Sequence, residues 1–187
     1  VLYNMILGKQ YINISTDQSH YQKINADPAF LSKSVVMKGK ISDMPAFMSG
    51  AAKTTLSNTC YIIKTTVTLP STVTEVVEVR LATVSSSLTV LGWTVVDDEF
   101  MTRYGGLGAS AYDIISTRLG NFAPASDGTV TAWMIGYGAN KFEVASGETL
   151  TMSVTTDQGV ISRVKTLKSN MTFEPGKIYR LTVDMTK

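Results

Sequence analysis

Apolar and polar residues alternate along much of the chain, and this period of two is the pattern of a β-strand with one face in a core. The clearest run is residues 179–185, where every odd position is apolar and every even position is polar. Residues 150–154 and 61–69 show the same pattern. The core that these runs predict is drawn from Ile63, Val67, Leu150, Met152, Val154, Tyr179, Leu181 and Val183.

Turn residues separate these runs at intervals of about ten residues, a spacing typical of a β-sandwich or barrel. Pro175 followed by Gly176 is the signature of a type II turn, so we expect residues 170–173 to form a hairpin with residues 179–185. The remaining predicted strands are 76–84, 87–96, 129–135 after the Asp127-Gly128 turn, and 160–167 after the turn at 156–159.

Helical signals are sparse. Residues 109–119 predict one short helix with Ser110 as its N-cap, and the proline in residues 27–31 suits the start of a helical turn. Residues 9–14 predict a strand, and residues 42–52 predict a loop. The expected fold is therefore all-β, an antiparallel β-sandwich with at most one or two short helices.

Composition supports a folded protein and excludes some partners. The chain has 187 residues, of which 44% are hydrophobic, so it can bury a core as one domain over residues 1–187. A weak boundary candidate is the glycine-rich stretch 103–108. A net charge of +2, scattered along the chain, does not suggest nucleic-acid binding. Because no apolar run is long enough to cross a bilayer, we expect no transmembrane segment. No leader pattern opens the chain, so any export signal lies outside this sequence or does not exist.

A single cysteine and a single histidine restrict the chemistry. Cys60 cannot form an internal disulfide, and we expect it to be a small buried side chain. His20 is the only base that a Ser-His-Asp triad could use, and a surface histidine is the simpler interpretation. Asp97, Asp98 and Glu99 are acidic neighbours without the regular spacing of a calcium loop. We therefore expect a protein that is not an enzyme and that needs no cofactor or metal.

The last third of the chain carries three patterns in a fixed order. The first is Thr131-Ala132-Trp133-Met134-Ile135, the second is the strand and turn of residues 146–159, and the third runs from Met171 to Met185. The third contains Phe173, then a glycine-lysine pair, and then the alternating terminal strand. In these patterns, residues 129–187 resemble the fimbrillin family of Bacteroidetes, whose members are subunits of surface fimbriae.

This resemblance implies a transthyretin-like, Greek-key β-sandwich that is exported as a lipoprotein and assembled at the outer membrane by β-strand exchange. The usual fimbrillin has two domains, so the resemblance allows either one complete domain or a fragment. Cys60 lies within a predicted strand and does not suit the lipidated position. The implied partners are other fimbrial subunits and, for an adhesive subunit, a host protein or glycan.

The terminal strand is the predicted assembly element, through Tyr179, Leu181, Val183 and Met185. Either this strand itself exchanges between subunits, or the chain accepts a strand without giving one. Because removing the strand would expose four apolar side chains, we favour the second interpretation, a tip or capping subunit. The alternative function is a carbohydrate-binding β-sandwich in which Trp93 or Trp133 stacks on a sugar ring. A tryptophan in a strand is more often a core or rim residue.

Overall fold

A computed structural model of the chain describes residues 60–91, 93–96, 99–102, 110–112, 114–137 and 141–187, with residues 3–7, 12–14, 20–23, 37–41, 49–50, 55 and 57–58 before them. These residues form strands, turns and loops. The predicted helical turn at 27–31 and the boundary candidate at 103–108 lie outside the described residues. So does most of the predicted loop 42–52. Of the strand predicted at 9–14, residues 12–14 are described and are a strand.

The strands are β1 (Tyr3–Leu7), β2 (Ile12–Ile14), β3 (His20–Lys23), β4 (Met37–Ile41), β5 (Ser57–Asn58), β6 (Cys60–Thr68), β7 (Val76–Ala82), β8 (Thr89–Leu91), β9 (Trp93–Val96), β10 (Glu99–Thr102), β11 (Ser110–Tyr112), β12 (Ile114–Phe122), β13 (Thr129–Tyr137), β14 (Phe142–Val144), β15 (Thr149–Thr156), β16 (Gly159–Thr166), β17 (Met171–Phe173) and β18 (Ile178–Asp184). The all-β prediction is confirmed.

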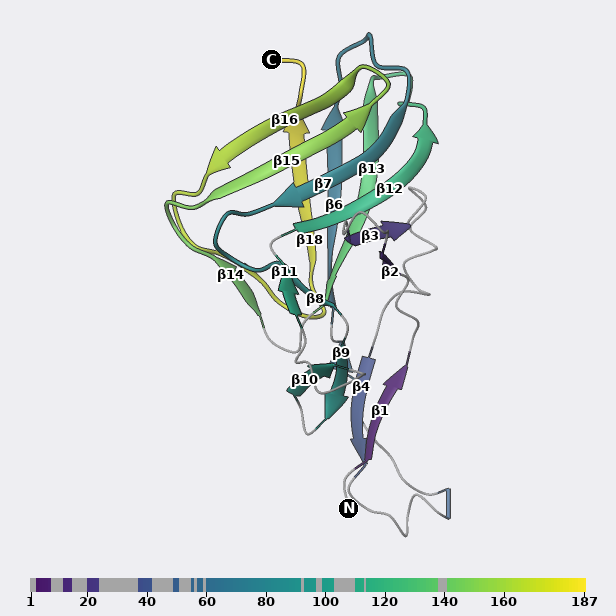
Figure 1. Cartoon of the computed structure of the whole chain (residues 1–187), viewed down its shortest axis with the longest axis vertical. Helices are drawn as coiled ribbons and strands as arrows, with labels where there is room; N and C mark the ends of the chain where they lie inside the picture. Colours follow the sequence, from purple (N-terminus) through teal and green to yellow (C-terminus); the bar gives the residue numbers. More distant parts are fainter. Residues whose placement is uncertain are drawn as a thin grey trace.

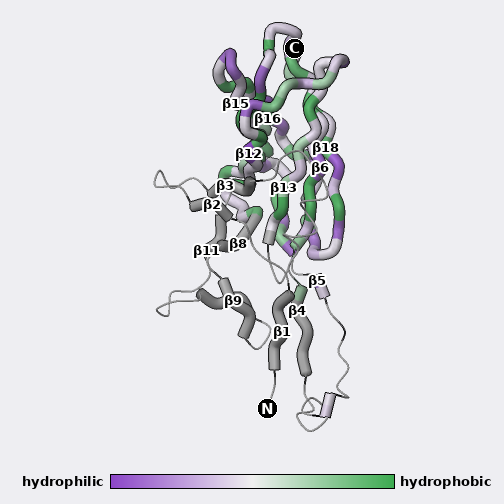
Figure 2. Tube along the Cα trace, turned by 90° about the vertical axis from the view of Figure 1, so that its right-hand side faces the viewer, coloured by the Kyte–Doolittle hydropathy of each residue, from purple (hydrophilic) through white to green (hydrophobic). Residues whose placement is uncertain are grey.

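Two sheets face each other as layers. The larger is six-stranded, in the order β16-β15-β7-β12-β3-β2, and the smaller is three-stranded, in the order β13-β6-β18. The strands of the larger sheet cross those of the smaller sheet obliquely in Figure 1, and Figure 2 shows the two layers side by side. Most pairs are antiparallel, but β18 pairs with β6 and β12 pairs with β3 in parallel. Strand pairs β9–β10, β8–β11 and β14–β17, and the group β1-β4-β5, form the smaller units.

The core lies between these layers, and the alternation along the strands predicts most of it. Ile63 and Val67 of β6 are buried, as are Leu150, Met152 and Val154 of β15. Three further predicted core residues, all in β18, are only partly buried and pack against the edge of the core: Tyr179, Leu181 and Val183. The predicted faces are therefore correct, while the burial of β18 is less complete than the pattern alone suggests.

An aromatic cluster centred on Tyr61 fixes one end of the core. The Tyr61 ring stacks on Phe173 with 5.0 Å between ring centroids and meets Tyr179 edge-on at 6.0 Å. Burial, and then the nearby Tyr179, raises the pKa of Tyr61 well above its usual value, so the hydroxyl stays protonated. It donates a hydrogen bond to the Leu88 carbonyl. Gly136 lies directly opposite on β13, where a Cβ atom would stand 2.2 Å from the Tyr61 ring.

Two carboxylates hold the segments at either end of β7 against the β15 hairpin. At one end, Asp157 accepts hydrogen bonds from the backbone N–H groups of Thr74 and Glu75, both at 3.2 Å. At the other end, Glu148 accepts the N–H groups of Ser85 and Ser86 at 2.8 and 2.7 Å. The backbone N–H groups of both loops therefore donate charge-assisted hydrogen bonds to carboxylates in the turns that flank β15.

The helix predicted at 109–119 is wrong. Ser110 pairs with Leu91 in the β11–β8 ladder, and residues 114–118 lie in β12 between β7 and β3. The segment forms a strand because Ile114, Ile115 and Thr117 are β-branched and favour extended backbone. Neighbours on both sides satisfy the backbone groups of β12, and this long-range pairing outweighs the local capping signal.

The hairpin predicted around Pro175 and Gly176 is also wrong, although its turn forms. Gly176 has a φ of 79°, as the third residue of a type II turn requires. The segments on either side do not pair, because β17 pairs with β14 and β18 crosses to pair with β6. Gly176 N–H donates to the Cys60 carbonyl at 2.8 Å, so the turn docks on β6 and directs the chain along it.

Candidate functional site

In the described part of the chain, the two facing sheets have unequal numbers of strands, and β18 has an edge with no strand paired to it. The smaller sheet ends at β18, whose only neighbour within the described part of the chain is β6. The larger sheet ends at β16, paired only with β15 there. The ends β18 and β16 lie on the same side of the molecule (Figure 1). A further strand beside β18 would therefore lie over β15 and β16.

Alternate backbone N–H and C=O groups of β18 point away from β6, toward the unpaired side of the strand. Toward β6, the Lys177 carbonyl accepts from Ile62 N–H at 3.0 Å, and Met185 N–H donates to the Thr68 carbonyl at 2.9 Å. Strand backbone groups alternate in direction, so the odd-numbered residues of β18 bond to β6. The N–H and C=O groups of Ile178, Arg180, Thr182 and Asp184 consequently point to the open side. An edge of this kind is a template for an incoming strand.

A groove of about 290 Å³ runs between this edge and the larger sheet. Its floor is apolar and comes from the core-facing side chains Leu81, Leu150 and Met152. One wall is the C-terminal half of β18, including Leu181 and Val183. The groove thus opens the apolar core to the surface of the molecule.

The opposite wall carries two cations, Arg163 and Lys165 of β16. Directly opposed residues of an antiparallel pair point to the same face of the sheet. Arg163 opposes Met152 and Lys165 opposes Leu150, and both of those partners face the core. The two cations therefore stand on the inward face of the edge strand, where charges guard against unspecific strand pairing.

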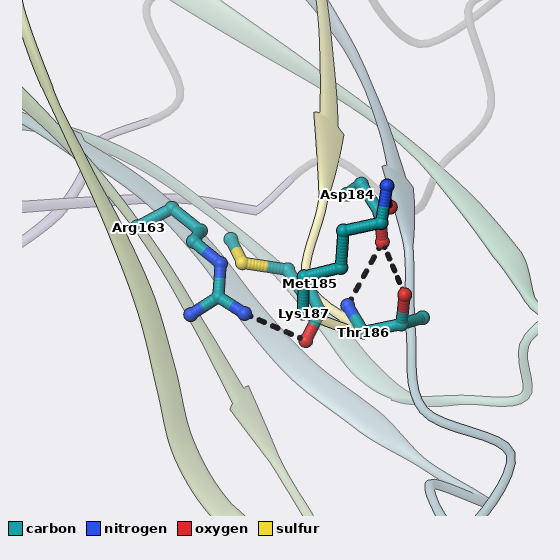
Figure 3. A network of polar contacts seen from close by, with 5 residues as sticks. All are labelled: Arg163, Asp184, Met185, Thr186 and Lys187. Atoms are coloured by element: carbon teal, nitrogen blue, oxygen red, sulfur yellow. Dashed lines mark hydrogen bonds and ion pairs between the residues drawn. The ribbon is translucent and has the colours of Figure 1, made fainter.

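Arg163 also spans the groove near the end of β18 (Figure 3). Its Nη2 atom donates to the Met185 carbonyl at 3.4 Å, and its Nη1 atom donates to the Ser162 carbonyl at 3.2 Å. The guanidinium therefore reaches from the larger sheet to the end of the smaller one. These bonds are long for charged donors, so they leave the guanidinium capable of stronger contacts.

A small turn closes the chain at this end of the groove. Asp184 Oδ1 accepts the N–H and hydroxyl of Thr186 at 2.9 and 2.6 Å, and Asp184 Oδ2 lies 3.6 Å from Lys187 Nζ. The Thr186 hydroxyl, more than any other group, lowers the pKa of Asp184 below its usual value. The Asp184 carboxylate is thus already engaged on the β18 side and opposes the cations only from across the groove.

The four residues of the predicted assembly strand have different surroundings. Leu181 and Val183 line the groove. Tyr179 lies away from it, packed edge-on against Phe173 at 4.9 Å, and its hydroxyl accepts from Glu174 N–H. Met185 is fully buried and follows the last residue of β18. The strand is therefore integrated into its own sheet by its inward face, while no other described strand pairs with its outer edge.

The structure describes the side chain of one of the two tryptophans proposed for sugar stacking. Trp133 is half-buried on the outer face of β13, and Lys64 Nζ lies 5.3 Å from its ring centroid in a cation–π contact. The ammonium of Lys64 thus lies over one face of this ring. Trp93 lies in β9, and its side chain is outside what the structure describes.

Other candidate groups contribute no described site. Cys60 is buried, as expected, with 3% of its surface exposed. His20 and Glu99 lie in β3 and β10 with their side chains outside the description, and Asp97 and Asp98 lie outside it entirely. Within the described residues, no three or more His, Cys, Asp or Glu side chains gather as a metal site. The same residues contain no helix long and apolar enough to cross a membrane.

Sequence reasoning missed Arg163 and Lys165 as functional candidates. A signal was present, because the two-residue turn at Asp157-Gln158 sets the register of β16 against β15. Continuing that register places both cations opposite apolar core residues, which is unusual unless the strand lies at an edge. Comparison with known proteins adds no identification, since no family model and no curated protein matches the chain.

Proposed function

We propose that this chain is a non-enzymatic structural or adhesive subunit of a bacterial cell-surface fimbria, assembled by β-strand exchange. In this proposal the open edge of β18 accepts a strand from a partner subunit. The chain acts at the outer membrane, where fimbrial subunits are exported as lipoproteins. Its partners are other fimbrial subunits and, if it stands at the tip, a host protein or glycan.

The observation that carries the proposal is the combination of an open backbone edge with an apolar groove beside it. An accepted strand would bond to the outward groups of Arg180, Thr182 and Asp184 and place alternate side chains over Leu150 and Met152. Main-chain hydrogen bonds then supply affinity, and the groove supplies selectivity. The resemblance of residues 129–187 to fimbrillins gives the assembly a biological setting.

The arrangement of β18 favours acceptance of a strand over donation of this one. β18 pairs with β6 at each of seven positions, from Ile178 to Asp184. Withdrawing it would open Ile63 and Val67 of the core to water and lose the packing of Tyr179 on Phe173. The cost is far larger than filling an edge that is already open, so we assign the chain an acceptor role, as in a tip or capping subunit.

The test uses Thr182, whose N–H points to the open side and whose side chain is exposed. Proline at this position removes only an outward donor, which edge strands tolerate. Thr182→Pro should keep the fold and abolish incorporation into fimbriae sheared from the surface of cells that produce the chain. Thr182→Ala, which keeps the N–H, should be incorporated like the original chain.

Folding of both variants is checked by far-ultraviolet circular dichroism and thermal melting of the purified chain. Equal incorporation of Thr182→Pro and Thr182→Ala would rule out strand acceptance at this edge. Absence of the unaltered chain from sheared surface material would rule out the fimbrial assignment itself.

A further inference from the structure

Among the described residues, the cationic wall formed by Arg163 and Lys165 has no acidic partner in an ion pair. Arg163 is half-buried and bonds only to backbone carbonyls, while Lys165 is exposed. Asp184 lines the same groove, but its oxygens are taken by Thr186 and Lys187. While no strand occupies the groove, solvent stabilises these two cations.

Occupation of the groove changes this balance. A strand beside β18 would cover the inward face of β16 and remove water from both cations. Burying a charge without a partner is costly, and the cost is offset only by a counter-charge with good hydrogen bonding. An occupant with apolar or neutral side chains at every inward position would leave Arg163 and Lys165 buried and uncompensated.

We propose that the groove selects a donor strand that carries a carboxylate on its inward face, opposite Arg163 and Lys165. This inference rests on the proposed function and names the chemistry of the partner. The donor places apolar side chains over Leu150 and Met152 and an aspartate or glutamate at a neighbouring inward position. A carboxylate can accept two bonds from the guanidinium of Arg163, which replace its two long bonds to carbonyls.

Two features of the wall support an acidic partner in particular. Arg163 and Lys165 are two residues apart on one strand, so their side chains lie on one face about 7 Å apart along it. Both can approach one carboxylate, or each can meet one of two inward acids. The wall also discriminates against other strands, because a cation at the same inward position would stand beside two like charges.

The test builds the donor into the chain. A strand of about eight residues is joined after Lys187 through a short flexible linker, so that it can fold back along the open edge of β18. Its residues alternate valine inward and threonine outward, and one central inward position is glutamate, glutamine or lysine. The three fusions differ by a single side chain, and they are measured by melting temperature and amide exchange.

The glutamate fusion should melt highest, the glutamine fusion lower and the lysine fusion lowest. Thr182 and Arg180 amides should be protected most strongly in the glutamate fusion. In the double variant Arg163→Gln with Lys165→Gln, the difference between the glutamate and glutamine fusions should disappear. In Lys168→Gln, which removes a cation from the turn after β16, the difference should stay.

The possible outcomes separate the two proposals. If all three fusions raise the melting temperature equally and protect the β18 amides, charge selection is overturned and strand acceptance stands. If the order survives loss of both cations, charge selection by this wall is likewise overturned. If no fusion raises the melting temperature or protects these amides, strand acceptance at this edge is overturned as well.

Discussion

Thr65 carries a buried hydroxyl group on β6. Its side chain is fully buried between Ala132 and Leu181 on the inner face of the smaller sheet. Its hydroxyl has no hydrogen-bond partner within the described structure. Valine has nearly the same shape and no hydroxyl to desolvate, so Thr65→Val should raise the unfolding free energy by about 1 kcal/mol. Urea denaturation followed by circular dichroism measures the change.

The matched control is the next residue of the strand. Thr66 points to the opposite, outer face of β6 and is only partly buried. Thr66→Val should change the unfolding free energy by less than about 0.5 kcal/mol, because its hydroxyl is not removed from water in the folded state. A loss of stability in Thr65→Val would mean that the buried hydroxyl has a partner which valine cannot replace.

The elements around β7 depend on two ionised carboxylates, and this gives the fold a predicted acid response. The hydroxyl of Ser86 and the N–H of Ser85 lower the pKa of Glu148 to about 2. The side chains of Gln158 and Thr74 lower the pKa of Asp157 to about 2. Both carboxyls thus bind protons less readily in the folded chain than in the unfolded chain. Their contribution to stability is complete above about pH 5 and is lost as the pH falls toward about 2.

The double variant Glu148→Gln with Asp157→Asn tests this directly. It should melt below the original chain at neutral pH, and the two melting temperatures should converge as the pH is lowered through this window. Glu174→Gln serves as the control, because this exposed carboxyl does not hold either loop. A constant difference between the double variant and the original chain at every pH would show that ionisation of the two groups does not stabilise the fold.

At the scale of secondary-structure elements, the sequence predicts well where strands form and poorly which strands pair with one another. Alternation is local, and it correctly assigned the inward faces of β6, β15 and β18. The β15–β16 hairpin was also predictable, because its turn joins neighbours in the sequence. The pairing of β18 with β6 was not, since it joins residues more than a hundred positions apart in parallel. The same limit explains the incorrect hairpin at Pro175 and the incorrect helix after Ser110.

The open edge belongs to the whole molecule and has no local signature. Within the described residues, three strands face six, and β18 and β16 both end their sheets on one side of the molecule (Figure 1). No property of residues 178–184 alone indicates that their outer edge is open. The alternation of residues 179–185 singled out the strand whose Leu181 and Val183 line the groove, but it could not locate the groove itself or the cations across from it.

An open edge in a sandwich also risks pairing with other copies of the same chain, and the cations of β16 suggest how this is limited. Their inward charges make the groove unfavourable for the neutral, threonine- and valine-rich strands in which this chain abounds. Replacing Arg163 and Lys165 together by valine should turn the wall apolar and allow copies to associate through their edges. The original chain should sediment as a monomer, and the double variant should form dimers or larger species at the same concentration.

The control for that experiment is Lys168→Val, which replaces one exposed cation by valine outside the groove. If edge pairing causes the association, adding Thr182→Pro to the double variant should reverse it, because the outward N–H on β18 is then missing. If the double variant stays monomeric, the cations do not guard the edge. If Lys168→Val associates equally, surface hydrophobicity alone explains the result. Reversal by the proline would show that self-association and strand acceptance use the same backbone edge. Arg163 and Lys165 would then determine which strands can pair with that edge.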